Sequence, residues 1–268
     1  MKLKSIFLSL IALGFVLSAV SCGESGDKTI KNEKLHPFLL SGVYTLGGYG
    51  GPSTLFSYVE QYATAQPGSS SFLKQMSEAY EEYFVFPYGT DSKREYQNAL
   101  EDWWGIENKE EFMETQEELL TNYHQASYEK VRKALDENGG ASADLTAIDL
   151  NKYGLDEEDA LADLRFVRDN YGKFSKAGIK AWDIVRYVNN VNFAHAAGYL
   201  NDSEAMEMAK KALTEAQKYY DSWTDYFNDY NLGRGFWGGD NSAEFDRIVS
   251  GILDKENVYN IYNYMGIK

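Results

Sequence analysis

Residues 179–198 constrain the fold most, because they have the spacing of a helix and yet are apolar around nearly the whole circumference. Ile179 and Trp182 lie on one apolar stripe, while Ile184 and Val188 lie on another. A helix of this kind is typical of the centre of a helical protein, where other helices cover every side. We therefore predict an all-α fold, a single multi-helix domain built around this buried helix.

Three polar residues interrupt the predicted central helix. Asp183, Arg186 and Asn190 stand at positions i, i+3 and i+7, so they fall along one line of its surface. A buried carboxylate and a buried guanidinium are tolerable only when they are paired and hydrogen-bonded. One interpretation is a structural ion pair that fixes how neighbouring helices dock. The alternative is a polar pocket around Asp183.

A second long helix is predicted to begin at the polar cap Asn201, with an apolar line at steps of three and four that includes Trp223. Such spacing is that of a packing face, so we assign its aromatic residues to the core rather than to a carbohydrate-binding platform. Residues 233–239 follow, where four glycines surround Arg234 and Trp237. Because glycine permits backbone angles that other residues resist, we expect a tight aromatic loop there.

Helix signals recur along the rest of the chain, and the total is roughly eight to nine helices with no convincing strand pair. All four prolines occur by residue 87, so proline interrupts no helix after that point. Residues 35–51 are expected to form an extended segment lying on the helices, and residues 138–154 a surface loop. Further helices are predicted to begin at Ser53, Ser71, Ser92, Asn108, Ser127, Asp156 and Ser242, with a last one over residues 256–268.

Five short motifs carry a resemblance to a known family. They are, in chain order, Trp104-Gly105-Ile106, Ala181-Trp182-Asp183-x-x-Arg186, Gly198-Tyr199-Leu200 before an acidic helix start, Ser222-Trp223, and Gly233-Arg234-x-x-Trp237. Together they resemble the bacterial family of the domain of unknown function 1266 over about residues 95–239, with a departure in the polar segment 138–153. The resemblance implies an α-helical domain without an assigned activity.

Residues 1–21 have the composition of a signal peptide, because two lysines precede an apolar run that is short for a membrane span. Small residues directly before Cys22 resemble the bacterial lipoprotein signal, in which the cysteine is lipidated and becomes the mature N-terminus. An ordinary secretory signal is the alternative. Cys22 is the single cysteine of the chain, which favours lipidation and leaves no disulfide, thiol nucleophile or cysteine-based zinc site for the folded domain.

Lipidation predicts a protein of the bacterial cell envelope, attached to a membrane through Cys22. Gly23 rather than aspartate follows the cysteine, which by analogy with lipoprotein sorting indicates the outer membrane rather than the inner one. Residues 22–34 are then a polar tether and residues 35–268 the helical domain. The formal charge of −15 becomes −17 without the two lysines of the signal peptide, which argues against nucleic acid as a partner.

No catalytic constellation stands out, and the sequence predicts neither a metal site nor a cofactor. The three histidines are scattered, and there is no phosphate-binding loop or nucleophile elbow. The residues that we single out as a pocket or a structural network are Trp104, Trp182, Asp183, Arg186, Asn190, Trp223, Arg234 and Trp237.

Two functional hypotheses remain. The first is a non-enzymatic binding or protein-interaction module that contacts a protein or a small molecule through residues 233–239 or through the Asp183 helix, and it predicts an exposed aromatic patch near that loop. The second is an envelope hydrolase in which Asp183 and Arg234 meet in a cleft. We favour the first, because tryptophan, glycine and an ion pair serve packing more readily than chemistry.

Overall fold

The computed structural model describes residues 29–268 apart from Asn122, Asp156 and residues 239–242. Within this part of the chain every regular element is helical, so the predicted all-α class is confirmed. Eleven helices have seven residues or more, a few more than the eight to nine expected, and α7 is a single turn. None of the described helices combines the length and the hydropathy that a membrane crossing requires. The predicted signal peptide and Cys22 lie outside the described residues.

The helices follow one another without a strand between them in the described ranges. The α-helices are α1 (Gly42–Gly48), α2 (Pro52–Tyr62), α3 (Ser70–Phe84), α4 (Lys93–Trp104), α5 (Lys109–Thr121), α6 (Tyr123–Glu137), α7 (Leu150–Tyr153), α8 (Glu157–Asp169), α9 (Lys180–Ala196), α10 (Asp202–Tyr219), α11 (Trp223–Phe236) and α12 (Ala243–Ile252). The 3-10 helices are η1 (His36–Ser41), η2 (Thr90–Ser92), η3 (Gly140–Ser142), η4 (Leu145–Ala147) and η5 (Ile261–Asn263).

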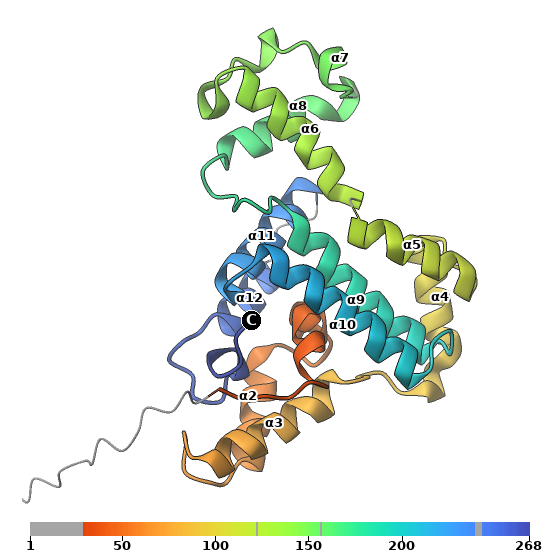
Figure 1. Cartoon of the computed structure of the whole chain (residues 1–268), viewed down its shortest axis with the longest axis vertical. Coiled ribbons are helices and arrows are strands. Elements are labelled where there is room, and N and C mark those ends of the chain that lie inside the picture. Colours follow the sequence, from red (N-terminus) through yellow and green to blue (C-terminus); the bar gives the residue numbers. More distant parts are fainter. Residues whose placement is uncertain (1–28, 122, 156, 239–242) are drawn as a thin grey trace, which may run out of the picture.

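Helix α9 is the centre of the molecule, as its apolar circumference predicts. Fourteen of its seventeen residues are buried, among them Trp182 and Ile184, one from each of the two apolar stripes. The helices α4, α5, α6, α10 and α11 and the turn η1 all pack on it (Figure 1). Neighbours on almost every side explain why so little of this helix is polar.

The described core has two hydrophobic clusters. The larger one surrounds α9, and the smaller one joins α6, α7 and α8, which Figure 1 shows grouped at one end of the molecule. Val131 and Leu135 of α6 meet Leu164 of α8 in the smaller cluster. Ile179, at the start of α9, and Phe236, at the end of α11, also belong to it. These two residues attach the smaller cluster to the central helices.

The prediction of a surface loop over residues 138–154 is wrong. The segment contains η3, η4 and α7, and it buries Leu145 and Tyr153 against the smaller cluster. Asn138 anchors its start, because its Nδ2 donates a hydrogen bond to the Tyr153 hydroxyl at 3.0 Å. The apolar residues stand on single turns of differing geometry, so they show no helical period in the sequence.

The second long helix expected after Asn201 is in fact two helices. Tyr220 adopts an extended backbone that ends α10, and Ser222 caps α11 by accepting a hydrogen bond from the backbone N–H of Asp225 at 3.1 Å. Serine is a strong N-cap because its hydroxyl competes for backbone N–H groups. The Ser222-Trp223 motif is therefore a helix start rather than the middle of a helix.

The glycine-rich segment after Asn231 was expected to be a loop, but residues 233–236 continue α11 as a helix. Gly233 is required by packing, since a Cβ added there would lie 2.5 Å from Cβ of Trp182 on α9. Because glycine has no Cβ, α9 and α11 can approach closely here, although glycine has a lower helix propensity than alanine. Gly239, the end of the expected loop, lies outside the described residues.

Both ends of the helical domain also differ from the prediction. Residues 35–51 form η1 and α1 rather than an extended segment, because these short helices are buried and need no polar face. Residues 256–268 contain only the turn η5, which Asn260 caps by accepting from the backbone N–H of Tyr262. The Tyr262 hydroxyl donates to the carbonyl of Leu39 at 2.9 Å, so the C-terminal segment is held against η1.

Candidate functional site

A pocket of about 340 Å³ opens beside the first three turns of α9. Four of the five tryptophans of the chain line it, and we call it the tryptophan pocket. Among the described residues its lining contains one cation and no carboxylate. The lining residues are Tyr44, Trp103, Trp104, Trp182, Arg186, Asn189, Asn190 and Trp237.

Four elements bring these residues together. Trp104 is the last residue of α4, which ends because Gly105 adopts a left-handed backbone with φ of 67°. Trp182, Arg186 and Asn190 lie on successive turns of α9 and thus share one face. Trp237 follows α11, and Tyr44 comes from α1. The pocket therefore depends on the docking of three other helices onto α9.

The Arg186 guanidinium lies among the tryptophan rings. Its central carbon is 4.3 Å from the ring centroid of Trp104, 4.7 Å from that of Trp182 and 5.8 Å from that of Trp237. These are cation–π distances. Burial lowers the pKa of Arg186 from its ordinary value, although an arginine remains charged at neutral pH. No described carboxylate forms an ion pair with it.

His124 lies between Arg186 and Asp183. Its Nδ1 is 2.7 Å from Oδ1 of Asp183, and the carboxylate can only accept, so Nδ1 is the donor. Nη1 of Arg186 is 3.1 Å from Nδ1 and 3.4 Å from Nε2, so the guanidinium lies against the imidazole ring. The described contacts contain no direct ion pair between Asp183 and Arg186, which was one of the two interpretations of the sequence; the His124 ring contacts both side chains instead.

The other oxygen of Asp183 caps a helix. Oδ2 accepts hydrogen bonds from the backbone N–H of His124 at 3.0 Å and of Gln125 at 3.3 Å, in the first turn of α6. The first N–H groups of a helix have no partner within it, and a carboxylate there also interacts favourably with the helix dipole. Asp183 is fully buried and its oxygens serve this docking, which is why it does not reach Arg186 directly.

Two lining residues have unpaired buried polar groups. Asn190 is 1% exposed, and neither its Nδ2 nor its Oδ1 has a hydrogen-bond partner among the described protein groups. The indole N–H of Trp182 is also buried without a partner in this part of the chain. Buried polar groups are almost always hydrogen-bonded, since leaving one unpaired costs about 1–3 kcal/mol. Both groups are therefore free to bond with a molecule that enters the pocket.

Two of the residues singled out from the sequence lie elsewhere. Trp223 donates from Nε1 to the carbonyl of Met265 at 2.6 Å and is buried in the main core. Arg234 lies over the ring of Phe245 at 4.3 Å. Neither Asp183 nor Arg234, which the alternative hypothesis placed together in a cleft, lines the tryptophan pocket.

Sequence reasoning missed some members of the site. Tyr44 and Asn189 line the pocket, and His124 connects Arg186 to Asp183 from 59 residues away along the chain. Trp103 also lines the pocket and was not singled out, although it stands directly before Trp104. Among the described residues, no group of three or more histidine, cysteine or acidic side chains is placed to hold a metal ion.

Comparison with known proteins matches residues 99–265 to the family described as "Protein of unknown function (DUF1266)". The "Uncharacterized protein YbeR" of Escherichia coli (strain K12) is 25% identical over 134 residues, which cover 50% of this chain and 54% of that protein. The "Uncharacterized protein YbeU" of the same organism is 38% identical over 66 residues, covering 23% of this chain and 26% of that protein. The chain therefore spans about half or less of the length of these curated relatives. No solved structure matches it.

Proposed function

Since this chain belongs to the DUF1266 family, whose description assigns no activity, we propose a function from the pocket itself: the protein is a non-enzymatic binding module. The tryptophan pocket takes a small ligand that has a flat apolar body and a negatively charged group. The observation that carries this proposal is the unpaired amide of Asn190 beside the Arg186 guanidinium in a tryptophan-lined cavity.

Arg186 supports the negative charge of the ligand. Its Nη1 faces His124, whereas its other N–H groups donate to no described protein group. A guanidinium is a planar fork that matches a carboxylate or a phosphate with two parallel hydrogen bonds. Burial strengthens such a contact, because the local dielectric is lower than that of water.

The tryptophans support the flat apolar body. Trp103 and Trp237 are 71% and 58% exposed, which is unusual for such large apolar side chains. Both line the pocket, and their exposed aromatic surface there supports a binding module. Aromatic walls with a few polar groups at fixed positions are typical of small-molecule sites.

Tryptophan fluorescence can test the proposal, since four of the five tryptophans line the pocket. The fifth, Trp223, is buried in the core and contributes a constant background. We would titrate the full chain with benzoate, benzyl alcohol and benzylamine, which share a ring and differ in charge. Benzoate should change the emission with saturation in the millimolar range, and the other two should bind at least about tenfold more weakly, which corresponds to 1.4 kcal/mol. Equal responses to all three would overturn the anionic class.

The position of the protein in the cell is part of the same proposal. We place it at the bacterial cell envelope, anchored through lipid on Cys22 and at the outer membrane rather than the inner one. Support comes from the sequence before Cys22 and from the glycine that follows it. Labelled palmitate should be incorporated into the wild type in a bacterial host and not into Cys22→Ser. A wild type without label would refute the lipid anchor and would leave the proposal for the tryptophan pocket unaffected.

A further inference from the structure

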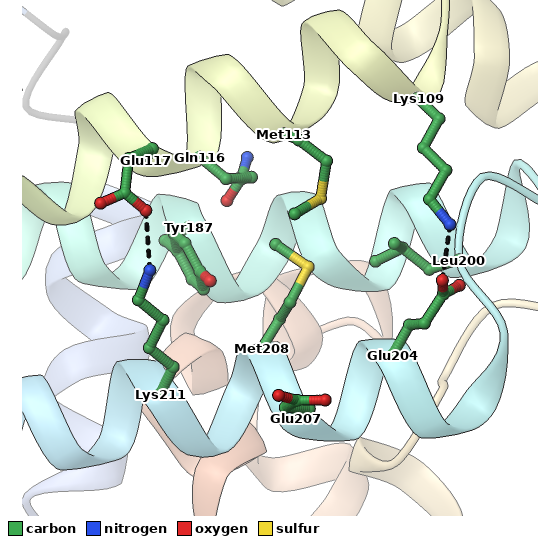
Figure 2. A pocket seen from close by; sticks show the side chains of 10 residues that line it. All are labelled: Lys109, Met113, Gln116, Glu117, Tyr187, Leu200, Glu204, Glu207, Met208 and Lys211. Atoms are coloured by element: carbon green, nitrogen blue, oxygen red, sulfur yellow. Dashed lines mark hydrogen bonds and ion pairs between the residues drawn. The ribbon is translucent and has the colours of Figure 1, made fainter.

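A second cavity, of about 440 Å³, lies between α5 and α10, with α9 behind it in Figure 2. It is separate from the tryptophan pocket and shares no lining residue with it. We call it the methionine groove. Its lining residues are Lys109, Met113, Gln116, Glu117, Tyr187, Leu200, Glu204, Glu207, Met208 and Lys211.

The groove exists because α5 and α10 both pack on α9 and are bridged to each other by long side chains. Figure 2 shows Met113 and Met208 facing each other across it. Two ion pairs cross it near its ends, Lys109 with Glu204 at 2.6 Å and Lys211 with Glu117 at 2.7 Å. Exposed pairs of this kind hold helices only weakly, and methionine is flexible, so the groove can adapt to an occupant.

Gln116 is the feature that points to a ligand. It comes from α5, lines the groove and is 1% exposed. Neither its Nε2 nor its Oε1 has a hydrogen-bond partner among the described protein groups. An amide both donates and accepts, so the group that satisfies it best is one that accepts and donates at the same time. A second carboxamide has this property.

The charges around the groove select against ionised ligands. Both lysines are paired with glutamates, and Glu207 forms no ion pair with a described residue. The lining thus carries one net negative charge, which disfavours an anion. The acid left for a cation is Glu207, which is exposed and lies away from the buried amide of Gln116. A cation deeper in the groove would have to bury its charge among apolar side chains, which is costly.

We propose that the methionine groove binds an uncharged, mostly aliphatic molecule that carries a carboxamide. Met113, Met208 and Leu200 contact its chain, and the Gln116 amide forms a paired hydrogen bond with its carboxamide. This site is additional to the tryptophan pocket, and neither depends on the other.

Methyl-labelled methionine and NMR give a direct test on the full chain. The probe is hexanamide, and hexanoate and hexylamine are the charged controls of equal chain length. Hexanamide should shift the methyl signals of Met113 and Met208, assigned with the Met113→Leu and Met208→Leu variants. The signals of Met76 and Met265, which are buried elsewhere in the core, should stay in place.

The variant Gln116→Met removes the amide and keeps an unbranched side chain. It should weaken hexanamide binding at least about tenfold while leaving the melting temperature unchanged or higher, because an unpaired buried amide is lost. The matched control is Gln217→Met on α10, whose amide donates to the carbonyl of Ile267 at 2.8 Å outside the groove. It should bind hexanamide normally and melt at a lower temperature.

Three outcomes would overturn the proposal. Hexanamide could leave the methyl signals of Met113 and Met208 unshifted, the charged probes could shift them equally, or Gln116→Met could bind hexanamide as tightly as the wild type. Benzoate titration of the tryptophan pocket is independent of all three outcomes. A failure of the methionine-groove proposal is therefore distinguishable from a failure of the proposed function of the tryptophan pocket.

Discussion

Asp183 on α9 caps α6 by accepting a hydrogen bond from the backbone N–H of His124 at 3.0 Å. One buried carboxylate thereby joins the central helix to the end of the molecule formed by α6, α7 and α8. The same carboxylate orients the imidazole that contacts Arg186 in the tryptophan pocket. Docking of the smaller cluster and geometry of the pocket are therefore connected through Asp183.

Asp183→Asn should destabilise the fold, because an asparagine can turn only one oxygen toward the two N–H groups and the imidazole. The expected loss is about 2–3 kcal/mol of unfolding free energy, as for a broken buried network. Urea unfolding measures it. The matched control Asp169→Asn, in an exposed pair with Arg168, should change the value by less than about 0.5 kcal/mol. Equal values for the two variants would contradict the capping role.

Asp229 on α11 should make stability depend on pH. Burial raises the pKa of its carboxyl to about 6, although hydrogen bonds from the Ser175 hydroxyl and backbone N–H partly oppose the shift. The folded protein then binds the proton more tightly than the unfolded chain. The stabilisation from this tighter proton binding at Asp229 is fully present below about pH 4 and is lost as the pH rises through about 6.

The variant Asp229→Asn isolates this effect from other titrating groups. The unfolding free energy of the wild type minus that of the variant should fall by about 2–3 kcal/mol between pH 4 and pH 7, because each unit of pKa shift corresponds to 1.36 kcal/mol. Urea unfolding at several pH values gives the difference. A difference that stays constant or increases with pH would show that the pKa of the Asp229 carboxyl is not raised in the folded protein.

Gly233→Ala should be destabilising even though alanine favours helix more than glycine does. The added Cβ would lie 2.5 Å from Cβ of Trp182, so α11 would have to move away from α9. We expect a loss of about 1–3 kcal/mol in thermal or urea unfolding. Gly48→Ala on α1 is the control, because no atom lies within 4 Å of the added Cβ and the change should be neutral or slightly stabilising. A neutral Gly233→Ala would mean that the two helices do not approach this closely.

Two asparagine-to-leucine substitutions should have opposite effects on stability. Asn190→Leu removes an unpaired amide and should stabilise the fold by up to about 1 kcal/mol, while abolishing the response to benzoate. Asn260→Leu should cost about 3 kcal/mol or more, because the Asn260 amide donates to the carbonyls of Ile252 and Asp254. Destabilisation by Asn190→Leu would indicate that this amide has a structural partner.

The parts of the fold that sequence reasoning predicted are those that depend on local pattern. The two apolar stripes, one with Trp182 and the other with Ile184, identified α9 as central, and most of the pocket lies on residues of the α9 face or on aromatic motifs. The break between α10 and α11 was missed, because Tyr220 keeps the helical spacing of its neighbours while its backbone is extended. Local spacing does not reveal where a serine cap starts a new helix and the preceding helix ends.

The remaining errors have a tertiary cause. Gly233 looked like a loop residue, and only the proximity of Trp182 explains why a helix needs a glycine there. His124 had no signal, because its role depends on α6 meeting α9 rather than on its neighbours in the chain. One interpretation paired Asp183 with Arg186 one turn away, but the unpaired N–H groups of α6 compete for its oxygens.

Benzoate titration of Arg186→Lys beside Arg234→Lys tests the central claim most directly. Both variants keep the positive charge and lose the guanidinium fork, but only Arg186 lines the tryptophan pocket. We predict that Arg186→Lys weakens benzoate binding at least about tenfold, or 1.4 kcal/mol, and that Arg234→Lys binds it as the wild type does. Equal affinity of the two variants for benzoate would contradict an anion site at Arg186.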